Sequence, residues 1–338
     1  MSQGFDQGGP PRHHLTRLAI GAAAIVVVLL VGLTVWLAKG RTQEIDDPVV
    51  APRSTTSLSE SAFPSKPRPT NESGDAAILS ACAPIKQTFP FPDRTCRIAV
   101  PPDLSGDKKG PVVILLHGFN TSSETEASIG GWRQTALRDS FTLVLPEGQG
   151  ASWNAGGCCA YAQRAHIDDI GYLTAVLDQV TKLPTTDPSR IYVVGESNGG
   201  MMAYAFGCAH ADRIAAIVSV EGTPVTSCRP PRPIPVLHVH GRADQTVPYN
   251  GGQSLIALLL GVQFPSAPGA VGRVAQAMGC GAPSADVVAG KVTTRDWTNC
   301  GGGSHVRLVS IDGMGHHWPG GEPFDATSEI ESFLGLRH

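Results

Sequence analysis

Residues 190–202 read RIYVVGESNGGMM. A β-branched apolar run ends in Gly195, Ser197 and Gly199, and a helix-forming segment, MMAYAFGCAH, follows. Such runs are typical of buried parallel strands, and Gly-x-Ser-x-Gly between strand and helix is typical of a nucleophile elbow, which lifts a serine above the sheet. Glycine and serine also form ordinary tight turns. The stretch alone therefore leaves two interpretations open, a nucleophile or a turn residue.

Five further apolar runs resemble the one that precedes Ser197. Helical patterns lie between runs, and in one of them Ile170, Leu173, Leu177 and Val180 recur at helical spacing. Alternating strands and helices predict an α/β fold with a mostly parallel, doubly wound sheet. The runs cover residues 111–118, 141–148, 213–222, 234–241 and 306–313.

Candidate partners for Ser197 follow later strands in the order that an elbow architecture requires. A serine attacks when a histidine accepts its proton and a carboxylate orients that histidine, and the order along the chain is serine, acid, histidine. Asp244 follows the run IPVLHVHG, and either His316 or His317 follows the run VRLVSIDG. The pattern predicts a Ser-Asp-His triad, and spacing leaves the choice of histidine open.

Two backbone N–H groups should stabilise the oxyanion of a tetrahedral intermediate. One is expected from Asn198, directly after the serine, and the other from the loop LLHGFNTSS, where Phe119 is the first choice and Asn120 the second. Trp153 and Trp318 are candidates to line the substrate cleft.

Two groups of residues also resemble metal ligands. His238 and His240 share a strand face, but no third ligand has matching spacing, and neutral histidines pack well in strands. His166 precedes Asp168 and Asp169, yet acids in the first turn of a helix are explained by its dipole. We therefore expect no metal and no cofactor.

The first 81 residues differ from the rest. Residues 18–38 are apolar throughout, long enough to span a bilayer, and the bulky Trp36 disfavours a cleavage site. This favours a transmembrane signal anchor after a tail at 1–17, with a cleaved signal peptide and secretion as the alternative. Residues 39–81, rich in Pro and Ser, are predicted to be a disordered linker before a folded domain at 82–338.

The cysteines indicate on which side of the membrane this domain lies. Eight cysteines follow the apolar stretch and none precedes it. An even set confined to one side predicts disulfides in an oxidising compartment, and therefore a single-pass protein with its domain outside the cytoplasm. Cys280 and Cys300 bracket one irregular segment and are the best-supported pair.

Composition and charge exclude one class of partner. The chain of 338 residues has an ordinary apolar content and a formal net charge of −3. No basic patch with interleaved aromatic residues occurs, which argues against a nucleic-acid partner. Nothing in the composition indicates the oligomeric state.

Six motifs together resemble the secreted esterases grouped with polyhydroxybutyrate depolymerases and feruloyl or acetylxylan esterases. In chain order they are HGFN, PEG with SWNAGGCC, DDIGYL, GESNGGMMAY, HGRADQTVPY and GMGHHWPGG. The resemblance implies an α/β-hydrolase fold without a metal and a triad of Ser197, Asp244 and His316. The sequence departs from the family pattern at Phe119, where a cysteine is frequent, and shortly before Cys280, where a tryptophan is common.

The resulting hypothesis is a membrane-anchored serine carboxylesterase. It would form an acyl-enzyme at Ser197 and hydrolyse it with water activated by His316. A small-molecule or oligomeric ester is the expected substrate, with neither its acyl nor its alcohol part specified. An acyltransferase acting on cell-envelope sugars and a catalytically idle envelope-tethered binding domain are the alternatives.

Overall fold

The computed structural model of the chain describes residues 78–86, 92–104 and 108–337. The tail and the apolar segment 18–38 lie outside these residues, as does most of the predicted linker. Every helix in the described ranges is too short or too polar to cross a membrane.

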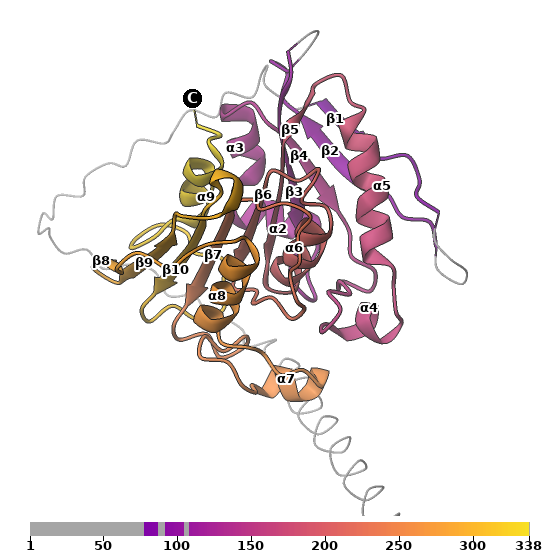
Figure 1. The fold of residues 1–338 in the computed structure, drawn as a ribbon. Coiled ribbons are helices and arrows are strands. Elements are labelled where there is room, and N and C mark those ends of the chain that lie inside the picture. Colours follow the sequence, from indigo (N-terminus) through magenta and orange to yellow (C-terminus); the bar gives the residue numbers. More distant parts are fainter. Residues whose placement is uncertain (1–77, 87–91, 105–107, 338) are drawn as a thin grey trace, which may run out of the picture. The chain divides into compact units, whose positions relative to one another are not determined.

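A ten-stranded sheet forms the centre of the domain (Figure 1). Its order is β1-β2-β4-β3-β5-β6-β7-β10-β9-β8. The strands from β4 to β10 pair in parallel, and both edges are antiparallel. The bounds are β1 Ile78–Ala81, β2 Cys96–Val100, β3 Gly110–Leu116, β4 Thr142–Pro146, β5 Thr186–Glu196, β6 Ala216–Val220, β7 Val236–Gly241, β8 Val287–Ala289, β9 Val292–Trp297 and β10 Val306–Ile311.

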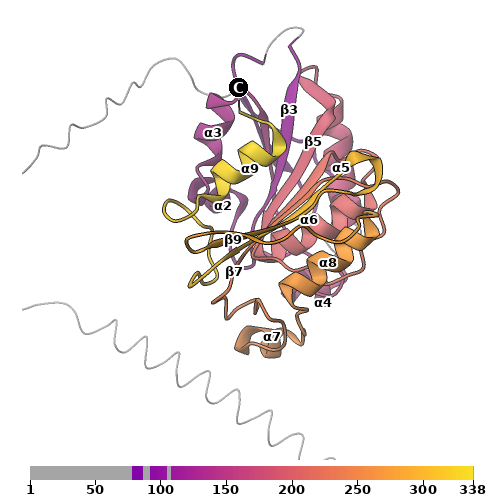
Figure 2. The same ribbon diagram turned by 60° about the vertical axis from the view of Figure 1, so that its left-hand side comes forward.

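Helices cover both faces of this sheet. Figure 2 shows α2, α3 and α9 on one face and α4, α5, α6 and α8 on the other. The bounds are α2 Ser123–Ile129, α3 Trp132–Arg138, α4 Ala160–Arg164, α5 Asp169–Thr181, α6 Ser197–Ala209, α7 Leu255–Leu260, α8 Ala267–Ala277 and α9 Ala326–Leu334, with a 3₁₀ turn at Gly301–Gly303.

The central strands are apolar throughout because both of their faces are covered. Every residue of β3, β4, β6 and β7 is buried. Two hydrophobic cores result, one on each side of the sheet. The mostly parallel α/β sheet predicted from the six apolar runs is confirmed, since each run overlaps one of the strands β3, β4, β5, β6, β7 and β10.

The segment between Cys280 and Cys300, which the sequence indicated to be irregular, contains β8 and β9. β9 pairs antiparallel with β10, so the segment extends the sheet. The predicted disulfide between Cys280 and Cys300 is confirmed. All eight cysteines are paired, and the other three disulfides are Cys82–Cys96, Cys158–Cys159 and Cys208–Cys228.

Candidate active site

The turn between β5 and α6 explains why Ser197 stands between glycines. Ser197 has a φ of 52°, a left-handed conformation that is strained for serine. A Cβ at Gly195 would collide with the carbonyl oxygen of Gly199, and a Cβ at Gly199 with that of Leu116. Only glycine on both sides lets the helix approach β3 and β5 this closely. The local geometry is that of a nucleophile elbow.

Three of the predicted site residues are hydrogen-bonded in one line. His316 Nε2 lies 2.9 Å from Ser197 Oγ, and His316 Nδ1 lies 2.7 Å from Asp244 Oδ2. Ser197 follows β5, Asp244 follows β7 and His316 follows β10, so all three lie at the carboxyl edge of the parallel part of the sheet. His317, the alternative left open by spacing, lines a separate cavity of about 220 Å³.

Asp244 is fixed by its own loop. Its Oδ1 accepts hydrogen bonds from the backbone N–H groups of Thr246, at 2.7 Å, and Val247, at 2.9 Å. Burial alone would raise the pKa of Asp244, but the neighbouring His240 and His316 outweigh it and hold that pKa well below its ordinary value. Asp244 is therefore ionised and accepts the N–H of His316.

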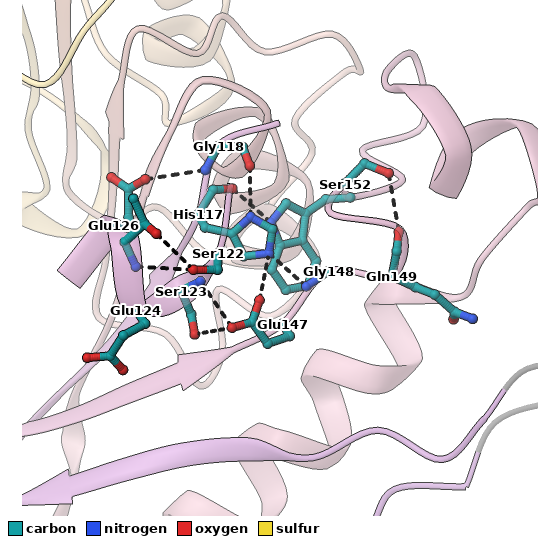
Figure 3. Close-up of polar contacts among 12 residues, drawn as sticks. His117, Gly118, Ser122, Ser123, Glu124, Glu126, Glu147, Gly148, Gln149 and Ser152 are labelled. Carbon is teal, nitrogen blue, oxygen red and sulfur yellow. Dashed lines mark hydrogen bonds and ion pairs between the residues drawn. The ribbon is translucent and has the colours of Figure 1, made fainter. Parts of the chain in front are cut away.

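The loop after β3 runs directly beside Ser197. A Cβ at Gly118 would lie 3.7 Å from the Cβ of Ser197. Figure 3 shows how His117 braces this loop: its Nδ1 donates to the Gly118 carbonyl at 2.7 Å, and its Nε2 accepts from the Gly148 N–H at 2.8 Å. This pattern requires a neutral imidazole, and burial lowers the pKa of His117 accordingly.

The two predicted oxyanion donors flank the serine. Phe119 follows Gly118 in the loop, and its ring is partly exposed. Asn198 is the second residue of α6, where a helix leaves its backbone N–H groups without intrahelical partners. Their assignment as oxyanion donors stays a prediction.

The side chain of Asn198 has a role that the sequence analysis missed. Its Oδ1 accepts from the Trp153 N–H at 2.7 Å, and its Nδ2 donates to the Trp153 carbonyl at 3.0 Å. The loop between β4 and α4 is thereby fastened to the elbow. No motif in the sequence indicates this contact, because it joins residues 45 positions apart.

Trp153 and Trp318, the candidates for lining the substrate cleft, are both buried in the structure. The Trp153 side chain has no exposed surface, since its indole donates to the His117 carbonyl at 2.9 Å and stacks on Tyr172. Trp318 is 6% exposed and donates to Thr327 Oγ1 at 3.1 Å. Both indoles support the loops of the site from within.

Three acids lie near the elbow, two of them fully buried, and no motif in the sequence indicated a role for them. Glu126 is fully buried, and burial and the neighbouring Glu196 raise its pKa well above the ordinary value. Burial also raises the pKa of Glu196. Glu126 Oε2 accepts from the Gly118 N–H at 3.4 Å, which ties this pair to the loop beside Ser197. The third acid is Glu221, at the end of β6.

The two groups that resembled metal ligands are engaged in hydrogen bonds. His238 Nε2 and His240 Nδ1 lie 3.0 Å apart, and burial lowers the pKa of His238 well below its ordinary value. Asp168 caps α5 by accepting from the Gly171 N–H at 2.8 Å, and Asp169 pairs with Arg94 at 2.7 Å.

Comparisons with known proteins agree with this geometry. The alpha/beta hydrolase fold family matches residues 111–251, which include the elbow and Asp244. The chain has an α/β-hydrolase fold. An acetyl xylan esterase from Aspergillus awamori has the same fold, with a TM-score of 0.55 at 13% identity, over 77% of this chain and 99% of that one.

Curated relatives of the chain are named as esterases. Feruloyl esterase B of Piromyces equi is 31% identical over 230 residues, which are 65% of this chain and 42% of that protein. A protein of Nocardia uniformis subsp. tsuyamanensis named "Putative esterase NocK" is 30% identical over 228 residues, 62% of this chain and 66% of that protein. The chain thus spans less than two thirds of the length of these relatives. The esterase resemblance is confirmed, while its polyhydroxybutyrate depolymerase part stays a prediction.

Proposed function

We propose that this α/β-hydrolase is a serine carboxylesterase with Ser197 as nucleophile, His316 as general base and Asp244 as the acid that orients it. The observation that carries the proposal is the unbroken hydrogen-bonded line from Ser197 Oγ through His316 to Asp244. The esterase names of its relatives support an ester as the substrate class.

The proposed reaction follows from the positions of these atoms. His316 Nε2 accepts the proton of Ser197 Oγ while the oxygen attacks the ester carbonyl carbon, and the ionised Asp244 stabilises the imidazolium. The N–H groups of Asn198 and Phe119 would stabilise the oxyanion. The intermediate collapses to an acyl-enzyme when His316 returns the proton to the leaving alcohol. Water then attacks the acyl-enzyme by the same steps, with His316 again as the base, which releases the carboxylic acid and restores the free serine.

We also propose that the domain works outside the cytoplasm, on an anchor formed by residues 18–38. The apolar stretch is long enough to span a bilayer. Four disulfides support an oxidising compartment.

Replacement of Ser197 tests the proposal. Ser197→Ala should abolish labelling by a fluorophosphonate probe and lower kcat on p-nitrophenyl acetate by a factor on the order of 10⁴ or more. Ser332→Ala, an exposed serine on α9, is the matched control and should behave like the wild type. Undiminished turnover in Ser197→Ala would refute the proposal. Release of free acid without an added acceptor distinguishes hydrolysis from acyl transfer to a sugar.

A further inference from the structure

Glu221 is a fully buried acid that lies against the proposed triad acid. It lies at the carboxyl end of β6, next to β7. Its Oε1 accepts from the Gly241 N–H at 2.9 Å, while its Oε2 lies 3.4 Å from His240 Nε2 and makes no hydrogen bond within the described residues. Carboxylate oxygens of Glu221 and Asp244 and a ring nitrogen of His240 all lie within 4.8 Å of one another.

Two adjoining buried carboxyl groups do not both ionise, so one of them holds a proton. Asp244 accepts two backbone N–H bonds and one from His316, with His240 Nε2 at 3.2 Å from its Oδ2. Glu221 accepts the single bond from Gly241. The charge is therefore better stabilised on Asp244, and the proton belongs on Glu221. Burial and the nearby Asp244 raise the pKa of Glu221 well above its ordinary value, in agreement.

His240 Nε2 lies close to both carboxyl groups, 3.2 Å from Asp244 Oδ2 and 3.4 Å from Glu221 Oε2, and the neighbours of the ring fix the position of its proton. Its Nε2 lies 2.9 Å from the Val247 carbonyl, which only accepts, so Nε2 carries a hydrogen. Its Nδ1 must then accept from His238 Nε2, at 3.0 Å. His238 Nδ1 accepts in turn from the Tyr204 hydroxyl on α6, at 3.0 Å. In this buried series of hydrogen bonds, every donor points in the same direction, from Tyr204 toward the loop that carries Asp244.

We propose that Glu221 and His240 are positioning residues for Asp244, with Glu221 acting as a neutral carboxyl that donates a hydrogen bond to it. This inference rests on the proposed function. When His316 becomes an imidazolium, Asp244 must stay ionised and in plane with Nδ1. The O–H of Glu221 and the Nε2–H of His240, which is shared between the Val247 carbonyl and Asp244 Oδ2, hold the carboxylate in that orientation. They favour its charged form over its protonated form.

Glutamine at position 221 tests the neutral donor. Glu221→Gln keeps an acceptor for Gly241 and an N–H donor for Asp244, so its kcat on p-nitrophenyl acetate should stay within roughly threefold of the wild type. Glu221→Leu removes both the acceptor and the donor. It should lower kcat by about tenfold to a hundredfold, because this is the effect of losing one hydrogen bond to a charged group, and it should leave KM unchanged. Rescue by glutamine but not leucine is the expected result.

The same comparison applies to His240. His240→Gln keeps an N–H near the Nε2 position and should retain more kcat than His240→Phe, which removes it. His305→Phe, a partly buried histidine that packs against Phe333, is the control and should keep wild-type kcat. Thermal unfolding of each variant establishes that the protein compared is folded. If Glu221→Leu or His240→Phe does not fold, the glutamine variants decide alone.

Several outcomes would overturn the inference. Glu221→Gln as inactive as Glu221→Leu would mean that a charged carboxylate is required. Folded Glu221→Leu with wild-type kcat would mean that Glu221 does not position Asp244. One equivalent of metal bound to the purified wild type, and lost in Glu221→Gln, would make the cluster a cation site. In each case a wild type that hydrolyses the ester and is labelled at Ser197 leaves the proposed function standing.

Discussion

At the residue scale, two adjacent histidines have different surroundings. His316 lies between the oxygens of Ser197 and Asp244, while His317 faces a cavity whose lining includes Glu322 and Phe324. Spacing could not separate them, since neighbours in a loop reach the same strand edge. The family motif favoured His316, and the hydrogen bonds agree with it.

Alanine at each histidine tests this difference. His316→Ala should lower kcat about as far as Ser197→Ala, because residues that act as a unit are not additive. Asp244→Asn should cost as much or less, since the base remains in place. His317→Ala should keep kcat within roughly tenfold, because it removes only packing. Turnover of p-nitrophenyl acetate by the three variants is the measurement. If His317→Ala is inactive and His316→Ala is active, the assignment of His316 as the general base is contradicted.

At the scale of elements, burial decided which strands could be predicted. Four strands are covered on both faces, and their sequences are therefore nearly continuous apolar runs: β3, β4, β6 and β7. The antiparallel edge strands escaped prediction because they lack such runs: β8 is exposed throughout, and β9 carries Arg295 and Asp296. Residues at strand ends were predicted for the site. Glu221 and the side chain of Asn198 were not, because their roles depend on partners distant in sequence.

The close contact between α6 and β3 predicts opposite effects of one methyl group at two glycines. Gly199→Ala should lower the free energy of unfolding by about 1–3 kcal/mol, because its Cβ collides with the Leu116 carbonyl. In Gly272→Ala, on α8, the added Cβ has no neighbouring atom, so the substitution should raise the free energy of unfolding by about 0.5–1 kcal/mol. Urea unfolding measures both. A neutral Gly199→Ala would mean that the elbow does not need this close approach.

At the scale of the whole molecule, four disulfides constrain the chain over very different lengths. Cys208–Cys228 spans a sequence separation of 20 residues, from α6 to the loop before β7. Cys158–Cys159 joins adjacent residues in the loop fastened to the elbow. A disulfide stabilises chiefly by restricting the unfolded chain, and this effect grows with the length of the closed loop.

Paired alanine substitutions should therefore differ in cost. Cys208→Ala with Cys228→Ala should lower the free energy of unfolding by about 3 kcal/mol, the chain-entropy value for a loop of this length. Cys158→Ala with Cys159→Ala closes no long loop and should cost clearly less. Urea unfolding without reductant compares them. An equal or larger cost at the adjacent pair would mean that its contribution comes from packing in the folded state.

The separation of Ser197, Asp244 and His316 along the chain has a consequence for biosynthesis. Ser197 and His316 are 119 residues apart, and the strand before His316 is the last of the sheet to leave the ribosome. A nascent chain that ends shortly after β7 has the proposed nucleophile and acid but lacks the proposed base. Esterase activity would thus arise in a single late event, and a partly synthesised chain would stay inert toward esters inside the cell. In a purified preparation, the amount of a covalent serine probe that is bound would then equal the amount of completely synthesised domain.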